Sequence, residues 1–331
     1  MIDTSIPKVQ TALHVVRQAA ILMRQIQQET VGSSLTKGDK SPVTVADFSA
    51  QAIIGRILSQ AFPDIPLVAE ETSTALREAD GAKILTQVTN YVGKVMPDAT
   101  KESVCEWIDY GGAEPGRQFW VLDPIDGTKG FLRGDQYVVA LALVENGIVQ
   151  IGVLGCPNLR DASILDMKGP GSIVLAIRGQ GTWSTSMAED DDKWKQLKVS
   201  ARSDSSQARL LRSFEAGHTN VSQIDQLADW LGVQVEPVRM DSQAKYAVLA
   251  AGGGEVILRL LSPDRLDYRE KIWDQAAGSI VLEEAGGRLT DLSGKPLDFT
   301  QGRMLTNNRG VLATNGLLHD KVLQGLNAVG G

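Results

Sequence analysis

Residues 122–131 read LDPIDGTKGF and place two carboxylates, Asp123 and Asp126, directly after an apolar run at 119–122. The apolar run, FWVL, has the composition of a buried strand. Pro124 fixes its own φ and restricts the residue before it to an extended form, so the pattern predicts that the strand ends here. Both Asp side chains would then be free to converge at the end of the strand.

The same break would release the carbonyl oxygen of Ile125 from strand pairing and add it to the two carboxylates. Hard cations such as Mg²⁺ prefer such all-oxygen ligand sets. The alternative is that Asp123 and Asp126 only cap a helix that begins at Gly127 and Thr128, which is a common role of aspartate. The local pattern leaves both interpretations open.

Three more acidic residues occupy comparable places in the predicted elements. Glu70 follows a predicted strand at 67–69, Asp47 lies near the start of a predicted helix, and Asp274 follows Trp273 at the start of another. If these groups met the first pair, two carboxylates about 4 Å apart would repel by roughly 1 kcal/mol in water and roughly 4 kcal/mol at an effective dielectric constant of about 20. Bound cations would then be required.

The composition is that of a globular protein with a substantial core, because 43% of the residues are hydrophobic and 22% are charged. At 331 residues the chain exceeds one ordinary domain, and the usual domain size predicts about two. The formal net charge of -7 offers no broad basic surface. Binding to nucleic acid is therefore not expected.

Cys105 and Cys156, together with three histidines, provide neither a disulfide framework nor a Cys/His zinc site of ordinary spacing. This usage favours a reducing compartment, and Cys156 is interpreted as a small buried hydrophobe. No run of about 18 uncharged apolar residues occurs, and the N-terminal sequence MIDTSIPKVQ has no signal-peptide or transit-peptide character. We expect a cytoplasmic protein, although an organelle form with its transit peptide removed would look the same.

Residues 1–195 are predicted to form an α+β domain that contains an antiparallel sheet. An amphipathic helix follows Pro7, and a second helix is capped by Thr44 and ends before Pro63. The segment 72–118 has helical spacing but no role that the sequence reveals.

Two hairpins are predicted in the rest of this domain. Strands 137–144 and 148–154 flank the Asn-Gly pair at 146–147, and strand 172–177 precedes a turn at 179–181. Beyond an acidic stretch, strands and helices alternate, which predicts an α/β domain over 196–331. Its predicted elements are strand 210–214, a helix through 224–231, strand 233–238, helix 242–251, strand 255–260 and helix 273–284.

Three motifs in this order resemble a known signature: Glu70-Glu71, DPIDGT at 123–128 and WDQAAG at 273–278. The signature is that of the lithium-sensitive, Mg²⁺-dependent phosphomonoesterases related to inositol monophosphatase and fructose bisphosphatase. The resemblance implies a two-domain layered αβαβα sandwich, of mixed α+β and α/β character.

Within that superfamily, longer strings resemble the 3′(2′),5′-bisphosphate nucleotidases of fungi and plants. They are LDPIDGTKGFLRGDQYVVALALVENGIVQIGVLGCPNL at 122–159, MDSQAKYAVLA at 240–250, VILRL at 256–260 and EKIWDQAAG at 270–278. The resemblance runs from Asp47 to about Thr314 and is weakest at 72–118 and 187–195.

The resemblance implies a metal site and a catalytic carboxylate. The implied ligands are Glu70, Asp123, the Ile125 carbonyl, Asp126 and Asp274, for two or three Mg²⁺ ions. Asp47 would work with Thr128 to orient and deprotonate the attacking water. In the alternative interpretation, Asp47 compensates charge at a helix start, Asp274 marks another helix start, and Glu71 is a solvated neighbour rather than an outer acid of the site.

The family's nucleotide-binding residues are matched by Thr128, His218, Ser242, Lys245, Arg259 and Asp274. We expect Lys245 and Arg259 to bind the 5′-phosphate and His218 to lie beside the adenosine. A solvated loop histidine, a helix cap at Ser242 and an exposed Lys245 are the alternatives. Arg259 interrupts an apolar strand, where an unpaired charge would be unfavourable.

The implied activity is removal of the 3′-phosphate from 3′-phosphoadenosine 5′-phosphate to give AMP, by in-line attack of water and with sensitivity to lithium. The 5′-phosphosulfate analogue is a second expected substrate. The alternatives are a main activity as an inositol polyphosphate 1-phosphatase and a catalytically silent nucleotide sensor. The expected partner is a small-molecule nucleotide, with no nucleic acid and no membrane, and the chain is expected to be a monomer.

Overall fold

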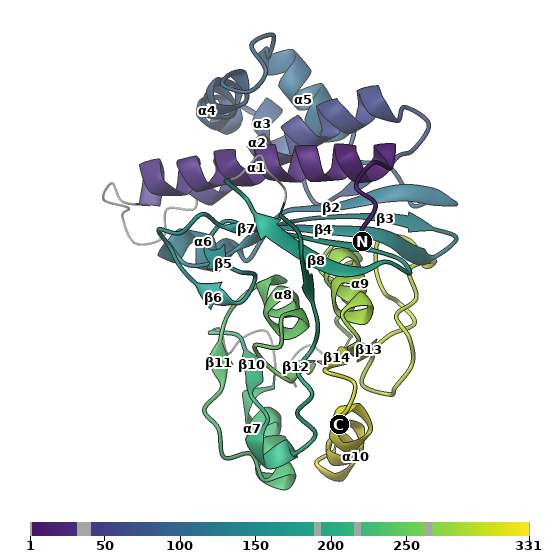
Figure 1. Cartoon of the computed structure of the whole chain (residues 1–331). Helices are drawn as coiled ribbons and strands as arrows, with labels where there is room; N and C mark the ends of the chain where they lie inside the picture. Colours follow the sequence, from purple (N-terminus) through teal and green to yellow (C-terminus); the bar gives the residue numbers. More distant parts are fainter. Residues whose placement is uncertain (1, 32–40, 189–192, 215–219, 262–266, 331) are drawn as a thin grey trace.

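Three layers of helices alternate with two large β-sheets in the computed structural model of the chain (Figure 1). The structure describes residues 2–31, 41–188, 193–214, 220–261 and 267–330. The helical layers are, in order, α1 (Pro7–Val31) with α2 (Ser41–Ala61), α8 (Ala244–Ala250) with α9 (Ala276–Glu284), and α7 (Val221–Leu231) with α10 (His319–Ala328). This αβαβα order confirms the fold that the resemblance implies.

The seven-stranded sheet lies between the first and second helical layers and has the order β1-β2-β3-β4-β7-β8-β9. Its strands are β1 (Leu67–Ala69), β2 (Gln118–Asp126), β3 (Val138–Glu145), β4 (Ile148–Cys156), β7 (Ser172–Ile177), β8 (Gly181–Ser186) and β9 (Lys195–Leu197). The predicted antiparallel pairing is correct except at one edge, where β1 and β2 run parallel. The predicted Asn-Gly turn is confirmed, since Asn146 and Gly147 have φ values of 52° and 75°.

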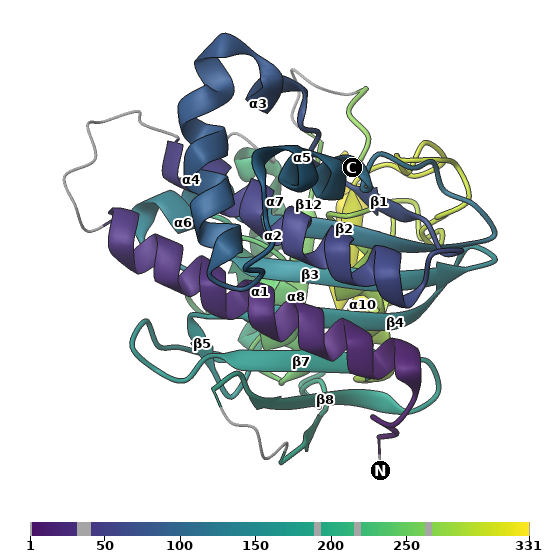
Figure 2. The same ribbon diagram turned by 90° about the horizontal axis from the view of Figure 1, so that it is seen from above.

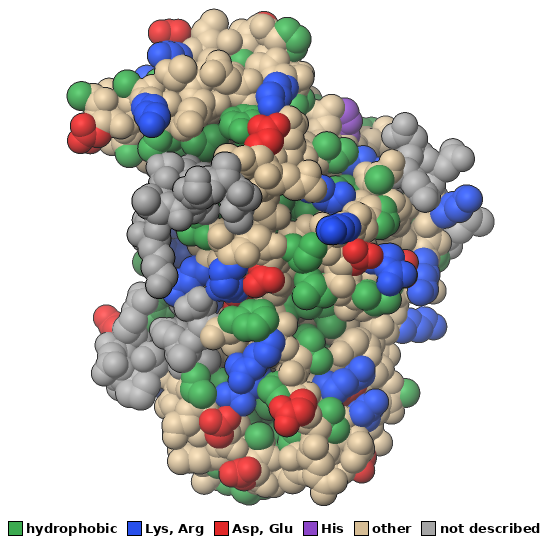
Figure 3. Space-filling model, turned by 90° about the vertical axis from the view of Figure 1, so that its left-hand side faces the viewer, with side chains coloured by type: hydrophobic (Ala, Val, Ile, Leu, Met, Phe, Trp, Pro, Cys, Tyr) green, Lys and Arg blue, Asp and Glu red, His purple; other side chains and the backbone are tan. Residues whose placement is uncertain are grey.

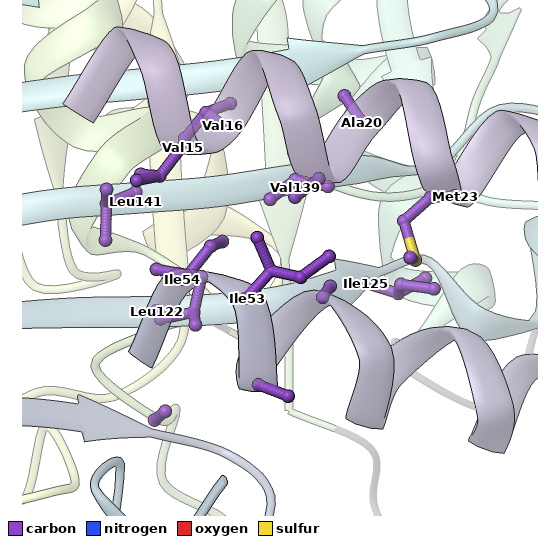
Figure 4. Packing of buried hydrophobic residues seen from close by; sticks show 14 of the residues in the cluster. Val15, Val16, Ala20, Met23, Ile53, Ile54, Leu122, Ile125, Val139 and Leu141 are labelled. Atoms are coloured by element: carbon purple, nitrogen blue, oxygen red, sulfur yellow. The ribbon is translucent and has the colours of Figure 1, made fainter. Parts of the chain in front are cut away.

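The two N-terminal helices lie across one face of this sheet (Figure 2). Ala20 and Met23 of α1 and Ile53 of α2 are fully buried in one hydrophobic cluster with Val139 and Leu141 of β3 (Figure 4). Full burial of a large apolar side chain contributes about 1.5–3 kcal/mol. The apolar stripe predicted after Pro7 is therefore the inner face of α1.

The second helix begins earlier than predicted. Ser41 and Pro42 are already helical, so Thr44 lies inside α2 and not at its cap. A proline is tolerated in the first turn because its missing N–H would have no intrahelical partner there.

The segment 72–118 is helical, as predicted, and packs on α2. It contains α3 (Thr74–Arg77), a 3₁₀ turn (Ala79–Gly81), α4 (Ala82–Gly93) and α5 (Lys101–Asp109). Thr100 caps α5, because its hydroxyl accepts the backbone N–H of Ser103.

The five-stranded sheet has the order β11-β10-β12-β14-β13. Its strands are β10 (Leu210–Arg212), β11 (Val238–Arg239), β12 (Val256–Arg259), β13 (Arg288–Thr290) and β14 (Val311–Thr314). The strand predicted at 233–238 is wrong in extent, since only its last residue belongs to β11, directly after Pro237, which has no N–H for a ladder. The chain passes from the seven-stranded sheet to the five-stranded sheet between β9 and β10. The domain division at 195/196 stays a prediction.

Short elements complete the described chain: β5 (Leu159–Arg160), β6 (Ile164–Leu165), α6 (Thr128–Arg133) and a 3₁₀ turn (Ser205–Gln207). None of the helices in the described ranges is long and apolar enough to span a membrane. The cytoplasmic location stays a prediction.

A buried histidine in the last helix predicts acid sensitivity of the fold. His319 is 0% exposed, and its ring nitrogens lie 3.0 Å from Thr290 Oγ1 and 3.1 Å from Thr314 Oγ1. Burial, and then the charge of Arg288, lower the pKa of His319 to about 4. The unfolded chain binds this proton below about pH 6.5 and the folded chain does not, so stability is present above that pH and falls by at most about 1.4 kcal/mol per unit towards pH 4.

The measurement is the free energy of unfolding from urea titrations at pH 7.5 and 5.0, for the wild type and His319→Asn. Acidic groups with raised pKa values make the folded chain more stable as the pH falls, and they are present in both proteins. The difference between the wild type and His319→Asn in the pH dependence of the free energy of unfolding therefore isolates the histidine. We expect the wild type to lose about 1 kcal/mol or more relative to the variant on acidification. Equal losses in both proteins would contradict this role.

Candidate active site

One cavity of about 490 Å³ brings together residues from distant parts of the chain. Nearly all of the site residues predicted from the sequence line it, and these are Glu70, Asp123, Ile125, Asp126, Thr128, Ser242, Lys245, Arg259 and Asp274. The acidic residues come from the ends of β1 and β2 and from the segment before α9. The predicted convergence of the two Asp side chains is therefore confirmed.

The convergence does not come from an end of the strand at Pro124, as was predicted. β2 continues to Asp126, and its pairing with β3 shifts between Asp123, opposite Ala140, and Asp126, opposite Val138. β2 therefore has one more residue than β3 in this interval, which is a β-bulge. Regular alternation would direct side chains three positions apart to opposite faces, and the bulge allows both carboxylates to face the cavity.

The helix-capping alternative fails for these two aspartates. α6 is preceded by Gly127, with a φ of 96°, and no side chain caps it. Asp126 instead accepts the backbone N–H of Gln243 at 2.6 Å. A Cβ atom on Gly127 would lie 2.8 Å from Cβ of Ser242, so this close approach requires glycine.

The carboxylates are crowded and have few hydrogen-bond donors. Asp123 is only 2% exposed, and its Oδ1 has no partner in the described part of the chain. Burial, and then the charges of Glu70 and Asp126, raise its pKa well above the usual value. Burial is also the main cause that raises the pKa of Glu70 to about 7 and that of Asp274 to about 8.

These side chains face one cavity without forming a closed ligand cluster. Within the described ranges, no three His, Cys, Asp or Glu side chains are already grouped closely enough to hold a metal ion. The orphaned Oδ1 of Asp123 and the raised pKa values still mark a site that favours a bound positive charge.

Asp47 lies beside the acidic end of β1 but is not part of the cavity lining. It is buried beyond the first turn of α2, so compensation of charge at the helix start does not explain it. Burial, and then the charges of Glu71 and Glu70, raise its pKa well above the usual value. Its Oδ1 has no hydrogen-bond partner among the described residues.

Gln51, one turn further along α2, holds the backbone next to Glu70. Its side-chain oxygen accepts the N–H of Glu71 at 3.0 Å, and its Nε2 donates to the Glu71 carbonyl at 2.7 Å. Glu71 is partly buried, with a pKa that burial raises, so it is not a fully solvated neighbour. The sequence analysis did not identify Gln51. The available signal was its position four residues after Asp47, which places both side chains on the same face of a helix.

Two basic residues, Arg259 and Lys245, line the same cavity close to the carboxylates. Arg259 donates from Nη2 to Glu270 at 2.9 Å and lies 3.9 Å from the Asp274 carboxylate. The pairing explains how an apolar strand tolerates this charge. Lys245 is only 9% exposed, so it is not on a solvated helix face, and burial followed by the charge of Arg259 lowers its pKa to about 8.

Ser242 lies just before α8, where the sequence left a nucleotide contact and a helix cap as alternatives. Its hydroxyl accepts the N–H of Ala244 at 3.1 Å, although the N-cap position of α8 belongs to Gln243. Its φ of 64° is rare for a residue with a side chain and is typical of functional sites.

Gln243 connects Asp126 to the carbonyl of Trp273, the residue before Asp274, and the sequence analysis did not identify it. Besides its backbone bond to Asp126, it donates from Nε2 to the Trp273 carbonyl at 3.0 Å, and its side-chain oxygen accepts the N–H of Gly278 at 2.9 Å. Its place beside Ser242 in the DSQAK string was the only available signal.

Further residues that the sequence did not reveal also line the cavity. They include the apolar residues Phe214, Val221, Ile224, Ile257 and Leu258 and the basic residues Lys129, Arg212 and Arg239. Lys and Arg side chains gather on the face of the molecule that carries α6 and β11 (Figure 3). His218 lies outside the described residues, and Cys156 is buried as predicted.

Comparisons with known proteins agree with the fold and the motifs. The model of the inositol monophosphatase family matches residues 2–329. The chain is 40% identical over 338 residues to a 3′(2′),5′-bisphosphate nucleotidase of Schizosaccharomyces pombe, covering 97% of this chain and 95% of that protein. It is 41% identical over 325 residues to one of Oryza sativa, covering 92% and 89%.

Among solved structures, a Thermotoga maritima IMPase has the same fold. Its TM-score is 0.63 at 21% identity, with 97% of each chain covered. The family model that matches nearly the whole sequence, together with the relatives about 40% identical, shows that the chain belongs to the inositol monophosphatase family.

Proposed function

We propose that this protein is a Mg²⁺-dependent phosphatase that removes the 3′-phosphate from 3′-phosphoadenosine 5′-phosphate, and also acts on the 5′-phosphosulfate analogue. The observation that carries the proposal is one cavity that brings the carboxylates together with the cations Lys245 and Arg259. The apolar side chains of the same cavity are suited to a nucleobase. The names of the relatives that are about 40% identical support the same substrate.

The donor set fits magnesium, on which this family depends in general. Glu70, Asp123, the Ile125 carbonyl, Asp126 and Asp274 would hold two or three ions, an all-oxygen set of the kind that Mg²⁺ prefers. Bound Mg²⁺ lowers the pKa of a water molecule and offsets the negative charge of the phosphate. Inhibition by lithium is part of the proposal.

The remaining residues would bind the nucleotide and move a proton. Asp47 would accept the proton of the attacking water, and Thr128 would orient that water. The water oxygen forms a bond to phosphorus while the bond to the ribose 3′-oxygen breaks, and this oxygen keeps the electron pair and takes up a proton from solvent to become the 3′-hydroxyl. Lys245 and Arg259 would bind the 5′-phosphate, Ser242 and Asp274 would contact the nucleotide, and His218 would lie beside the adenosine.

The test is phosphate release from 3′-phosphoadenosine 5′-phosphate with Mg²⁺, after chelation, and with added lithium. We expect release that requires Mg²⁺ and that lithium suppresses. Inositol 1,4-bisphosphate is measured in parallel, and a higher kcat/KM for it would replace the proposed substrate. No release from either substrate at saturating Mg²⁺ would favour a silent nucleotide sensor.

Lys245→Met is expected to raise KM for the nucleotide about tenfold or more and to change kcat little, because one charge-assisted phosphate contact is lost. The melting temperature should not fall, since the substitution replaces a buried cation with an apolar side chain of similar length. Steady-state kinetics and thermal unfolding measure the two effects. Lys83→Met, at an exposed position of α4, is the matched control, and an unchanged KM in Lys245→Met would remove this lysine from the nucleotide site.

A further inference from the structure

Arg303 lies on a segment that runs alongside the residues leading to Asp274. The Ile272 N–H donates to the Arg303 carbonyl at 3.2 Å, and the Leu305 N–H donates to the Glu270 carbonyl at 2.9 Å. The backbone of Arg303 is therefore fixed to the segment that carries one of the acidic residues of the site.

The guanidinium group of Arg303 contacts the edge of the seven-stranded sheet. Its Nη1 donates to the Ala113 carbonyl at 2.9 Å, and its Nη2 donates to the carbonyl of Ala69, the last residue of β1. The centre of the same group lies 5.0 Å from the centroid of the Trp273 ring, a distance typical of a cation–π contact.

These contacts involve the neighbours of two proposed metal ligands. Ala69 immediately precedes Glu70, and Trp273 immediately precedes Asp274. We propose that Arg303 is a positioning residue that sets the separation of Glu70 and Asp274 and thereby the affinity of the site for Mg²⁺. This inference rests on the proposed function, because the metal site is part of that proposal.

Other contacts fix the remaining sides of the site. Gln51 holds Glu71 on the far side of Glu70, and Gln243 connects Asp126 to the Trp273 carbonyl. Arg303 adds the connection between the end of β1 and the residue before Asp274. The planar guanidinium group of arginine can donate to two carbonyl oxygens and lie against an aromatic ring at the same time. A lysine ammonium cannot replace it.

The test compares Mg²⁺ binding by titration calorimetry, without nucleotide, in the wild type, Arg303→Met and Arg303→Lys. Loss of contacts that orient metal ligands typically weakens metal binding about 10–100-fold, so we expect a Kd at least about tenfold higher in Arg303→Met. In Arg303→Lys we expect a Kd at least about threefold higher, because the planar guanidinium group is lost while the charge is kept. At saturating Mg²⁺, KM for the nucleotide should stay within about twofold of the wild type, since Arg303 does not line the cavity.

Arg288→Met is the matched control, since Arg288 forms an exposed ion pair with Asp320, and its Mg²⁺ affinity should equal that of the wild type. Circular dichroism checks that each variant folds, and Arg303→Lys decides the outcome if Arg303→Met does not fold. A wild-type Kd in a folded Arg303 variant would overturn the inference. A wild type that binds Mg²⁺ but leaves the nucleotide intact would overturn the proposed function alone.

Discussion

Asp126→Asn is expected to lower kcat for phosphate release by about a thousandfold or more, since it removes a negatively charged oxygen from the proposed metal site. The amide oxygen of asparagine can still accept the Gln243 N–H, which Asp126 accepts at 2.6 Å, so the local fold should be kept. Single-turnover phosphate release at saturating Mg²⁺ measures the effect. Asp320→Asn, in an exposed ion pair, is the control and should have wild-type activity.

The same substitution is expected to stabilise the metal-free protein. Asp126 raises the pKa values of Asp123, Glu70 and Asp274, which shows that these carboxylates repel one another. Without one of the charges, the melting temperature in chelator should rise by about 2 °C or more. Unchanged activity together with an unchanged melting temperature would mean that Asp126 is not part of a crowded metal site.

Arg259→Met should have the second large effect, on both stability and substrate binding. Glu270, its partner at 2.9 Å, is only 5% exposed and would lose the cation that pairs with it. Loss of one partner from a buried ion pair costs about 3 kcal/mol or more. The lost phosphate contact should also raise KM for the nucleotide about tenfold or more.

A second variant separates the two effects. In Arg259→Met/Glu270→Gln the buried charge is removed, so the free energy of unfolding should return towards the wild-type value while KM stays high. Urea titrations and steady-state kinetics on the wild type, the single variant and the double variant measure this. If the double variant recovered both quantities, Arg259 would have only a structural role.

The local elements of the fold were predictable because local patterns specify them. The apolar spacing after Pro7 predicted α1, and the Asn-Gly pair at 146–147 predicted the turn between β3 and β4. Element ends were predicted less well, as at Thr44 and at 233–238, because tertiary packing and proline decide where an element stops.

The sequence by itself determined the chemistry of this protein: carboxylates at the ends of predicted strands, the family motifs around Asp123 and Asp274, and a single arginine inside an apolar strand. Only the tertiary structure decided how these groups meet. The bulge in β2, the position of Asp47 beside Glu70, and the bonds made by Gln243 and Arg303 all depend on contacts between distant segments. Periodicity and turn rules describe residues a few positions apart, so they contain no information about which distant backbone groups a side chain will bind.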